Sequence, residues 1–362
     1  MRTCTRCIMN DSADPTITFD ENGYCNYCTD ALAKINTTAY FPNEEGEKRL
    51  HALLEQVKKS GEGKPYDCIM GLSGGLDSAY LASLGCTWGL RILAVHVDDG
   101  YDTDVSKENV RKLVEKAGIK MITVTPDAEQ YNALLLAYMR AGVPNLAVPQ
   151  DNILLKCLFD AVKEYKIPYF LSGDNFALEC VLQRGNTYQS MDVVNIRDIH
   201  KRFGTQPINK LKFISAYEKY YSTRVAGMHL EKPLNYIDYN RERAFRELKE
   251  FCGFEYYGRK HLENKFTAFL QLRWLPEKFG VDKRLSHLSS MIVSGQMTRE
   301  EALAEAARPI CEGVPMDEYV AEIKANMHLS DTEFEEIMRA PTHQHTEYKT
   351  DRLDAALRSV LH

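Results

Sequence analysis

The residues best suited to chemistry form one short run, Ser73-Gly74-Gly75-Leu76-Asp77-Ser78. It follows an apolar stretch, residues 66–72, that predicts a buried strand, and it precedes residues 79–84, which predict the first turns of a helix. Glycines between a strand and a helix let the backbone approach a ligand closely, while free N–H groups and the helix dipole favour negative charge. The run therefore predicts a pyrophosphate site, to which the hydroxyls of Ser73 and Ser78 add hydrogen bonds. The carboxylate of Asp77 fits such a site only if a divalent cation or a structural hydrogen bond offsets its charge.

The same run resembles the PP-loop, S-G-G-x-D-S, of the ATP pyrophosphatases, a superfamily that includes GMP synthetase, NAD synthetase, asparagine synthetase and the tRNA-thiolating enzymes. It is not a Walker A loop, and a glycine-rich turn without a ligand is the alternative. The resemblance implies that ATP is cleaved between its α and β phosphates, that AMP passes to a carbonyl or amide oxygen, and that ammonia or sulfide then displaces AMP. It assigns catalytic roles to Asp77 and Ser78, and it implies that ATP and pyrophosphate are bound by Leu72, Ser73, Gly74, Gly75, Asp77 and Ser78.

Three further apolar runs alternate with helical patterns after this loop. Strands are predicted at 92–97, 121–124 and 168–172, and helices at 104–117, 127–140 and 151–165. The alternation predicts an α/β fold with a doubly wound parallel sheet, in which ligands bind at the carboxyl ends of the strands. The resemblance specifies the PP-loop type of this fold, also called adenine nucleotide alpha hydrolase-like.

Several polar residues and glycines stand where these strands end. By the same resemblance, Val97 and Asp98 meet the nucleotide and Gly173 lies against it. Asp174 is then a catalytic candidate that holds Mg²⁺ or substrate. Capping of the following helix is the alternative for both aspartates.

Four cysteines near the N-terminus have the spacing of a metal site. Cys4 with Cys7 and Cys25 with Cys28 each form a C-x-x-C pair, and two such turns can close a tetrahedron around one zinc ion. The short segment between the pairs predicts a zinc ribbon whose stability depends on the metal. An iron–sulfur cluster and a redox pair are the alternatives. The other cysteines stand among apolar residues and are predicted to be buried thiols; Cys180 is predicted to pack in a helix core.

Composition narrows the classes of protein that fit. The chain has 362 residues, of which 44% are hydrophobic and 27% charged, and its net charge is −6. No apolar run is long enough for a membrane span, and the first residues lack a signal segment, so we expect a cytoplasmic protein. The negative charge disfavours a nucleic-acid partner. Arg2 after the initiator and the absence of a nucleophile motif around any cysteine predict that no glutaminase is built into this chain.

The C-terminal third has a helical pattern. Helices are predicted at 241–251, 261–275, 282–294, 316–327, 330–339 and 351–361, with Pro276 stopping the second, and a capping box at 298–301 opens another. His343 and His345 lie in a polar linker and are predicted to be solvated. Basic and aromatic side chains alternate over residues 256–284, which fits either an anion-binding face or a solvated one.

These features together are similar to the N-acetyl sugar amidotransferases of bacterial lipopolysaccharide O-antigen and legionaminic- or pseudaminic-type sugar biosynthesis. The similarity rests on the cysteine pairs, the PP-loop, Gly173-Asp174-Asn175 and the segment 264–302, and it runs from Cys4 to about Pro309. It implies ATP with Mg²⁺, conversion of an acetamido group on a nucleotide-linked sugar to an acetamidino group through an O-adenylyl imidate, and release of AMP and pyrophosphate. Substrate contacts are expected from Lys265, Lys283 and Arg284.

The resemblance also implies partners and a domain arrangement. Ammonia would come from a glutaminase subunit that works with a cyclase-like barrel, the two resembling the halves of imidazole glycerol phosphate synthase. The predicted divisions are a zinc-ribbon module at 1–45, a PP-loop domain at 46–235 and a helical substrate or partner region at 236–362. A PP-loop tRNA-modifying enzyme, of the thiolation or lysidine type, and a non-catalytic zinc-ribbon adaptor are the alternatives.

Overall fold

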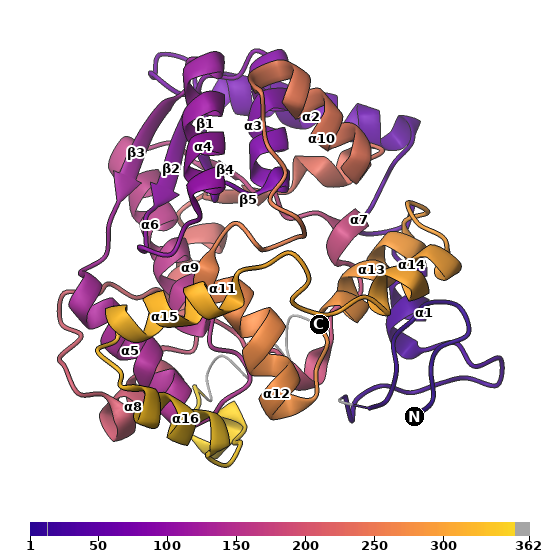
Figure 1. Cartoon of the computed structure of the whole chain (residues 1–362). Helices are drawn as coiled ribbons and strands as arrows, with labels where there is room; N and C mark the ends of the chain where they lie inside the picture. Colours follow the sequence, from indigo (N-terminus) through magenta and orange to yellow (C-terminus); the bar gives the residue numbers. More distant parts are fainter. Residues whose placement is uncertain (13, 352–362) are drawn as a thin grey trace.

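A parallel five-stranded sheet is the centre of the computed structural model, which describes residues 1–12 and 14–351 (Figure 1). Its strands lie in the order β3-β2-β1-β4-β5. Their bounds are β1 Cys68–Gly71, β2 Ile92–Val97, β3 Lys120–Val124, β4 Tyr169–Leu171 and β5 His229–Glu231. In the register of the sheet, Ile69 lies opposite Leu93 on one side and Phe170 on the other. This confirms the predicted α/β fold. Strand β5 has no sequence signal because two of its three residues, His229 and Glu231, are polar.

Side chains alternate across the sheet, and helices cover both faces. Met70 and Ala94 point into a core with the helices of one face, whereas Ile69 and Leu93 pack with the other. The first face carries α2 (Glu44–Ser60), α3 (Leu76–Thr87), α4 (Asp104–Ala117) and α10 (Arg241–Cys252). The second carries α6 (Val148–Tyr165), with α9 (Ala216–Arg224) nearby (Figure 1). Since neither face is left to solvent, the sheet is doubly wound as predicted.

A second core lies beyond the carboxyl ends of the strands. It centres on Trp274 and Tyr138, both fully buried. The helices around it are α5 (Ala128–Ala141), α8 (Val193–Phe203), α11 (Lys265–Phe269), α12 (Leu275–Phe279), α15 (Met316–Asn326) and α16 (Asp331–Arg339). The chain thus places a helical layer directly opposite the strand ends where ligands of α/β folds bind.

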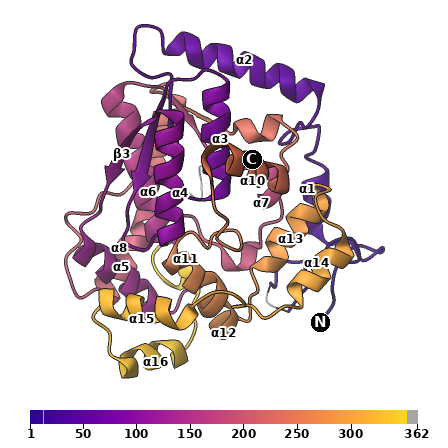
Figure 2. The same ribbon diagram turned by 45° about the horizontal axis from the view of Figure 1, so that its top comes forward.

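The N-terminal module packs on a third group of helices. Helix α1 (Asn26–Leu32) lies beside α13 (Arg284–Val293) and α14 (Arg299–Ala306), away from the sheet, in both views (Figures 1 and 2). Helix α13 in turn packs on α7 (Phe176–Glu179), which follows β4: Ser290 Oγ accepts a hydrogen bond from the N–H of Val181 at 2.9 Å. Short 3₁₀ turns complete the described chain at Arg184–Asn186, Pro233–Tyr236 and His345–Glu347.

Two sequence predictions in the C-terminal third are wrong. The helix predicted over 261–275 begins at Lys265, where Asn264 caps it, and it continues past Pro276 to Phe279. A π-helical turn, η3 (Leu270–Trp274), precedes α12 and puts Pro276 in a first turn, where its missing N–H is tolerated. His345 is buried rather than solvated, because its ring stacks on Tyr188 at 4.3 Å. His343 is half-exposed beside Glu347.

Other helix predictions hold closely. Gly118 and Gly253 end α4 and α10 in the left-handed conformation, and the capping box of Thr298 with Glu301 is formed. The helix predicted at 351–361 lies outside the described residues. Over residues 1–12 and 14–351, no helix combines the length and apolar character that a membrane span requires.

Candidate active site

The PP-loop, Ser73–Ser78, connects β1 to α3 at the centre of the sheet. Gly74 has a φ of +79°, and a Cβ at this position would lie 2.1 Å from Ser106 Oγ, so only glycine fits. The Oγ atoms of Ser73 and Ser78 lie 3.2 Å apart, and Ser73 Oγ accepts from the N–H of Gly75 at 3.2 Å. The loop thus gathers two hydroxyls and a helix N-terminus at one point, which is the arrangement that binds an anion.

The loop opens into a cleft of about 510 Å³ between the sheet and the helical layer. Most of the residues predicted to bind ATP or substrate lie on its wall: Leu72, Ser73, Gly75, Asp77, Ser78, Val97, Gly173, Asp174 and Lys283. Residues between 256 and 283, from the predicted basic and aromatic stretch, form another part of the wall. The structure therefore joins the strand ends and the C-terminal third in one site.

Four predicted site residues do not line this cleft. Gly74 faces Ser106 instead, and Asp98 Oδ1 accepts from the N–H of Gly100 at 3.1 Å within a tight turn. Two basic residues are used in structural ion pairs. Lys265 binds Glu322 at 2.6 Å. Arg284 binds Asp282 at 2.7 Å and also donates to carbonyl groups at the end of α14 and just beyond it.

Lys283 differs from these two cations. Lys283 lines the cleft, and within residues 1–12 and 14–351 its ammonium has neither a hydrogen bond nor an ion pair. Burial lowers the pKa of Lys283, with Asp14 acting in the opposite sense. An unpaired cation on the wall of a cleft is suited to an anionic group of a ligand.

The carboxylate of Asp77 is already compensated by the protein. Lys260 Nζ lies 2.7 Å from Asp77 Oδ2, and the hydroxyl of Tyr239 donates to Oδ1. Burial opposes ionisation of Asp77, but Lys260 and Tyr239 outweigh it and hold its pKa below the usual value. Of the two ways in which Asp77 could fit this site, the structure has the structural hydrogen bond. Sequence reasoning missed Lys260 as a site residue, although it belongs to the basic stretch.

The two aspartates at the other strand ends do not cap helices. Asn175 caps α7, and Thr103 caps α4. Asp174 is exposed to the cleft, and its carboxylate lies 3.2 Å from Lys232. Its accessible oxygens fit a divalent cation, whereas those of Asp77 are taken.

Glu263 is a second residue that sequence reasoning missed. Its side chain lines the cleft, its Oε1 would lie 2.8 Å from a Cβ at Gly75, and its buried Oε2 has no hydrogen-bond partner in the described part of the chain. Burial raises the pKa of Glu263 to about 7. A carboxyl group beside a phosphate loop is thus near the boundary between its neutral and charged forms at neutral pH.

Backbone pairing fixes Glu263 and its neighbours against the sheet. Asp102 and Asn264 form an antiparallel bridge, and the carbonyl of Glu263 accepts from the N–H of Thr103 at 2.9 Å. Asn264 also donates to Asp99 at 3.0 Å, while Asp99 accepts from Gln150 at 2.7 Å. The start of the C-terminal wall is therefore attached to the loop that follows β2.

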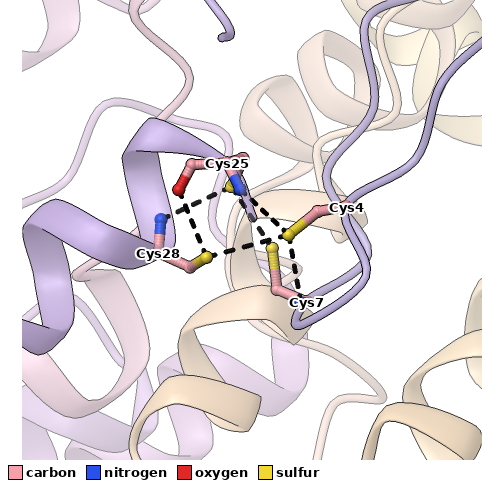
Figure 3. A group of neighbouring side chains, drawn as sticks. All are labelled: Cys4, Cys7, Cys25 and Cys28. Atoms are coloured by element: carbon pink, nitrogen blue, oxygen red, sulfur yellow. Dashed lines mark hydrogen bonds between the residues drawn. The ribbon is translucent and has the colours of Figure 1, made fainter. Parts of the chain in front are cut away.

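The four predicted metal ligands meet at one point (Figure 3). Their sulfur atoms are buried and all lie within 4.8 Å of one another, with Cys4 to Cys28 at 3.7 Å and Cys7 to Cys25 at 3.5 Å. A tetrahedron with Zn–S bonds of about 2.3 Å has S–S edges of about 3.8 Å, so the four thiolates fit one zinc ion. Backbone N–H groups donate to these sulfurs, for example Cys25 to Cys4 Sγ at 3.2 Å, as expected for thiolate ligands.

The cysteine cluster contacts α13 and α14, the two helices that follow Lys283 in the chain. The guanidinium of Arg299, on α14, donates to the carbonyls of Cys4 and Cys7, both at 3.1 Å. Ser289 Oγ, on α13, accepts from the N–H of Ile8 at 3.3 Å. Lys283 immediately precedes α13, so the metal module supports one wall of the cleft from behind.

A parallel sheet with a glycine-rich loop after its central strand places the chain in the class of doubly wound α/β proteins, many of which bind ligands at their strand ends. Residues 263–360 match the family model described as LPS biosynthesis protein WbpG-like, C-terminal domain. The match confirms the resemblance predicted from residues 264–302 and extends it beyond Pro309. No curated protein matches the chain.

Several solved structures are similar to the chain at low identity. NMN synthetase from Francisella tularensis is 15% identical, with 79% of this chain and 97% of that chain covered and a TM-score of 0.39. NH3-dependent NAD synthetase from Campylobacter jejuni is 17% identical, with 70% and 97% covered and a TM-score of 0.31. The U34-tRNA thiolase NcsA from Methanococcus maripaludis, solved with its [4Fe-4S] cluster, is 16% identical, with 87% and 92% covered and a TM-score of 0.35. All three scores lie below 0.5.

Proposed function

We propose that this chain is an ATP-dependent amidotransferase that converts an acetamido group of a nucleotide-linked sugar to an acetamidino group, in the biosynthesis of bacterial O-antigen or a related surface polysaccharide. One observation carries the proposal: the PP-loop and the first part of the WbpG-like segment, between residues 263 and 283, line the same cleft. A loop suited to pyrophosphate indicates adenylyl transfer, and the family description supplies the lipopolysaccharide context.

The reaction has two steps. The acetamido oxygen attacks the α-phosphorus of ATP, the bond from that phosphorus to the bridging oxygen breaks, and pyrophosphate leaves with the electron pair. Ser73, Gly75 and Ser78 hold the leaving group, while Val97 and Gly173 lie against the nucleotide. Ammonia then attacks the imidate carbon and AMP departs. The protein contributes positioning and stabilisation of the developing charge.

Two metals belong to the proposal. Mg²⁺ bound with ATP would neutralise phosphate charge, and Asp174 is the residue that would hold it. Zinc in the Cys4, Cys7, Cys25 and Cys28 site has a structural role, since all four tetrahedral positions are filled by protein ligands. The divisions at 45/46 and 235/236 stay predictions. Helix α10, which begins just after the second division, packs on α3, one of the helices that cover the sheet.

Ammonia comes from a partner glutaminase in this proposal, together with a cyclase-like barrel. Among the described residues no cysteine lines the cleft, and Cys180 Sγ lies 3.9 Å from the carbonyl of Ser290, with burial raising its pKa to about 11. The isolated chain should therefore use ammonium salts and not glutamine. If the rigorously pure chain forms product from glutamine, the proposal of a partner glutaminase is refuted.

The deciding experiment incubates the protein with ATP, Mg²⁺, ammonium and candidate diacetamido nucleotide-sugars. We expect a sugar product one mass unit lighter than the substrate, with AMP and pyrophosphate released in equal amounts. Formation of ADP, or no turnover with any diacetamido sugar, would contradict the proposal. AMP release that depends on added tRNA would identify the tRNA-modifying alternative.

A further inference from the structure

Lys260 is one cation shared between two acids at the bottom of the cleft. Its Nζ lies 2.7 Å from Asp77 Oδ2 and 2.7 Å from Glu179 Oε1, and its side chain is 11% exposed. Burial disfavours the charged ammonium, but the two carboxylates outweigh this and raise the pKa of Lys260. The lysine is therefore held protonated at a fixed place, in a trio whose net charge is negative.

This place is the crevice between the central strand and its neighbour. Asp77 follows β1, and Glu179 follows β4, which is where the strand order changes direction. The loops after these strands touch, since a Cβ on Gly173 would lie 2.8 Å from the N–H nitrogen of Ser78. Ligands of open α/β sheets bind in this crevice.

In the proposed binding mode the phosphate chain extends from the PP-loop toward Lys260, which lines the same cleft. The PP-loop donors take the pyrophosphate end of ATP, and the next phosphorus along the chain, the α-phosphorus, then lies toward the crevice. An ammonium has three N–H donors, of which the two carboxylates use two. Lys260 lines the same cleft as Ser78, and among the described residues its ammonium has no partner besides Asp77 and Glu179, which leaves one donor for a ligand.

We propose that Lys260 is a catalytic residue for adenylyl transfer, donating its third hydrogen bond to a non-bridging oxygen of the α-phosphate. The inference rests on the proposed function and adds a residue to it. As the acceptor oxygen bonds to the α-phosphorus and the bond to the bridging oxygen breaks, the ammonium balances charge on the phosphoryl oxygens. Pyrophosphate takes the electron pair, and Lys260 keeps its proton throughout. Asp77 and Glu179 hold the ammonium in position.

The test must separate this role from simple neutralisation of Asp77. Lys260→Met alone leaves two carboxylates unpaired and can fail to fold. The double variant Lys260→Met with Glu179→Gln removes one cation and one acid, so the net charge of the trio is unchanged. The wild-type chain, whose trio has the same net charge, is the matched control, and Glu179→Gln alone measures the effect of Glu179 itself.

Two measurements decide the outcome. We expect the double variant to melt within a few degrees of the control, to release pyrophosphate about 100-fold more slowly, and to bind an α,β-methylene analogue of ATP about tenfold more weakly by calorimetry. Equal pyrophosphate release and equal analogue binding in the double variant and the wild type would overturn the inference. If the wild-type chain releases no pyrophosphate at all, the proposed function fails, and the calorimetry still decides whether Lys260 contacts a nucleotide.

Discussion

The two walls of the cleft are built in different ways. The strand-end wall offers backbone N–H groups and small hydroxyls, and its shape depends on glycines such as Gly74 and Gly173. The wall from the C-terminal third offers long ionisable side chains: Lys260 and Glu263 lie in a segment with little regular structure before α11, and Lys283 lies just before α13. A backbone wall is set by local geometry, whereas a side-chain wall depends on what packs behind it. We therefore expect substitutions in the strand-end wall to act through local backbone geometry, and substitutions that affect the side-chain wall to act through the packing behind it.

We expect the largest effect from a substitution in the predicted metal site, because this site supports the side-chain wall. Cys25→Ser removes one of four thiolates, so the chain should lose its zinc and melt at least about 5 °C lower. Because Arg299 and Ser289 attach the module to α13 and α14, the sugar KM should rise as well. Metal analysis, calorimetric melting and kinetics measure these changes.

Cys252→Ser is the control for that variant. Cys252 is a partly buried thiol on α10 whose Sγ donates to the carbonyl of Leu248, a bond that serine can also make. It should retain metal and activity. A Cys25 variant that loses zinc yet melts like the wild type would show that the module folds by burial alone.

In the strand-end wall, we expect the strongest effect from a substitution of Gly74. Gly74→Ala places a Cβ 2.1 Å from Ser106 Oγ at a φ of +79°, so pyrophosphate release should fall by about 100- to 1,000-fold with a normal zinc content. Gly118→Ala is matched in having a positive φ, +62°, with nothing within 4 Å. It should cost only about 1 kcal/mol of stability and no activity. Equal rates of pyrophosphate release in the two variants would show that the close contact between position 74 and Ser106 does not explain the effect.

The stability of the folded chain should depend on pH through Glu263. Its pKa is raised from 4.5 to about 7 in the folded chain, so the folded state holds its proton more tightly than the unfolded state. The associated stability is full below about pH 4.5 and is lost as the pH rises through 7, amounting to at most about 3 kcal/mol. Glu263→Gln should therefore melt at nearly the wild-type temperature at pH 4.5 and higher than the wild type at pH 8. A constant difference across this range would exclude Glu263 as the titrating group.

The smallest effect is expected at Lys283. Lys283→Met removes the unpaired cation, and the KM for an anionic sugar nucleotide should rise about 10- to 100-fold while the KM for ATP stays unchanged. Lys265→Met, which breaks only the pair with Glu322, is the control and should leave both constants close to wild type. If the two variants behave alike, Lys283 does not contact the sugar substrate.

The difference between the walls also explains what the sequence could predict. The strands, the PP-loop and the four cysteines follow local patterns, since periodicity and spacing alone bring these groups together. Lys260 and Glu263 could not be assigned in this way, because their partners Asp77 and Gly75 lie far away in the sequence. The helix predicted from 261 starts later because Asp102 pairs with Asn264, a contact between distant segments. His345 looked solvated in a polar linker, yet Tyr188 and Asn195 enclose it.

The contact between Arg299 and the cysteine carbonyls has a consequence for the order of events during synthesis. Arg299 and Cys4 are 295 residues apart in the chain. At about 5 to 20 residues per second, the ribosome adds Arg299 roughly 15 to 60 s after Cys4. The four cysteines can capture their metal early in that interval, but the surface that later receives α13 and α14 stays uncovered until nearly the whole protein has been made. All four cysteines are thus made well before the helices that cover them, and until then one side of the cluster is open.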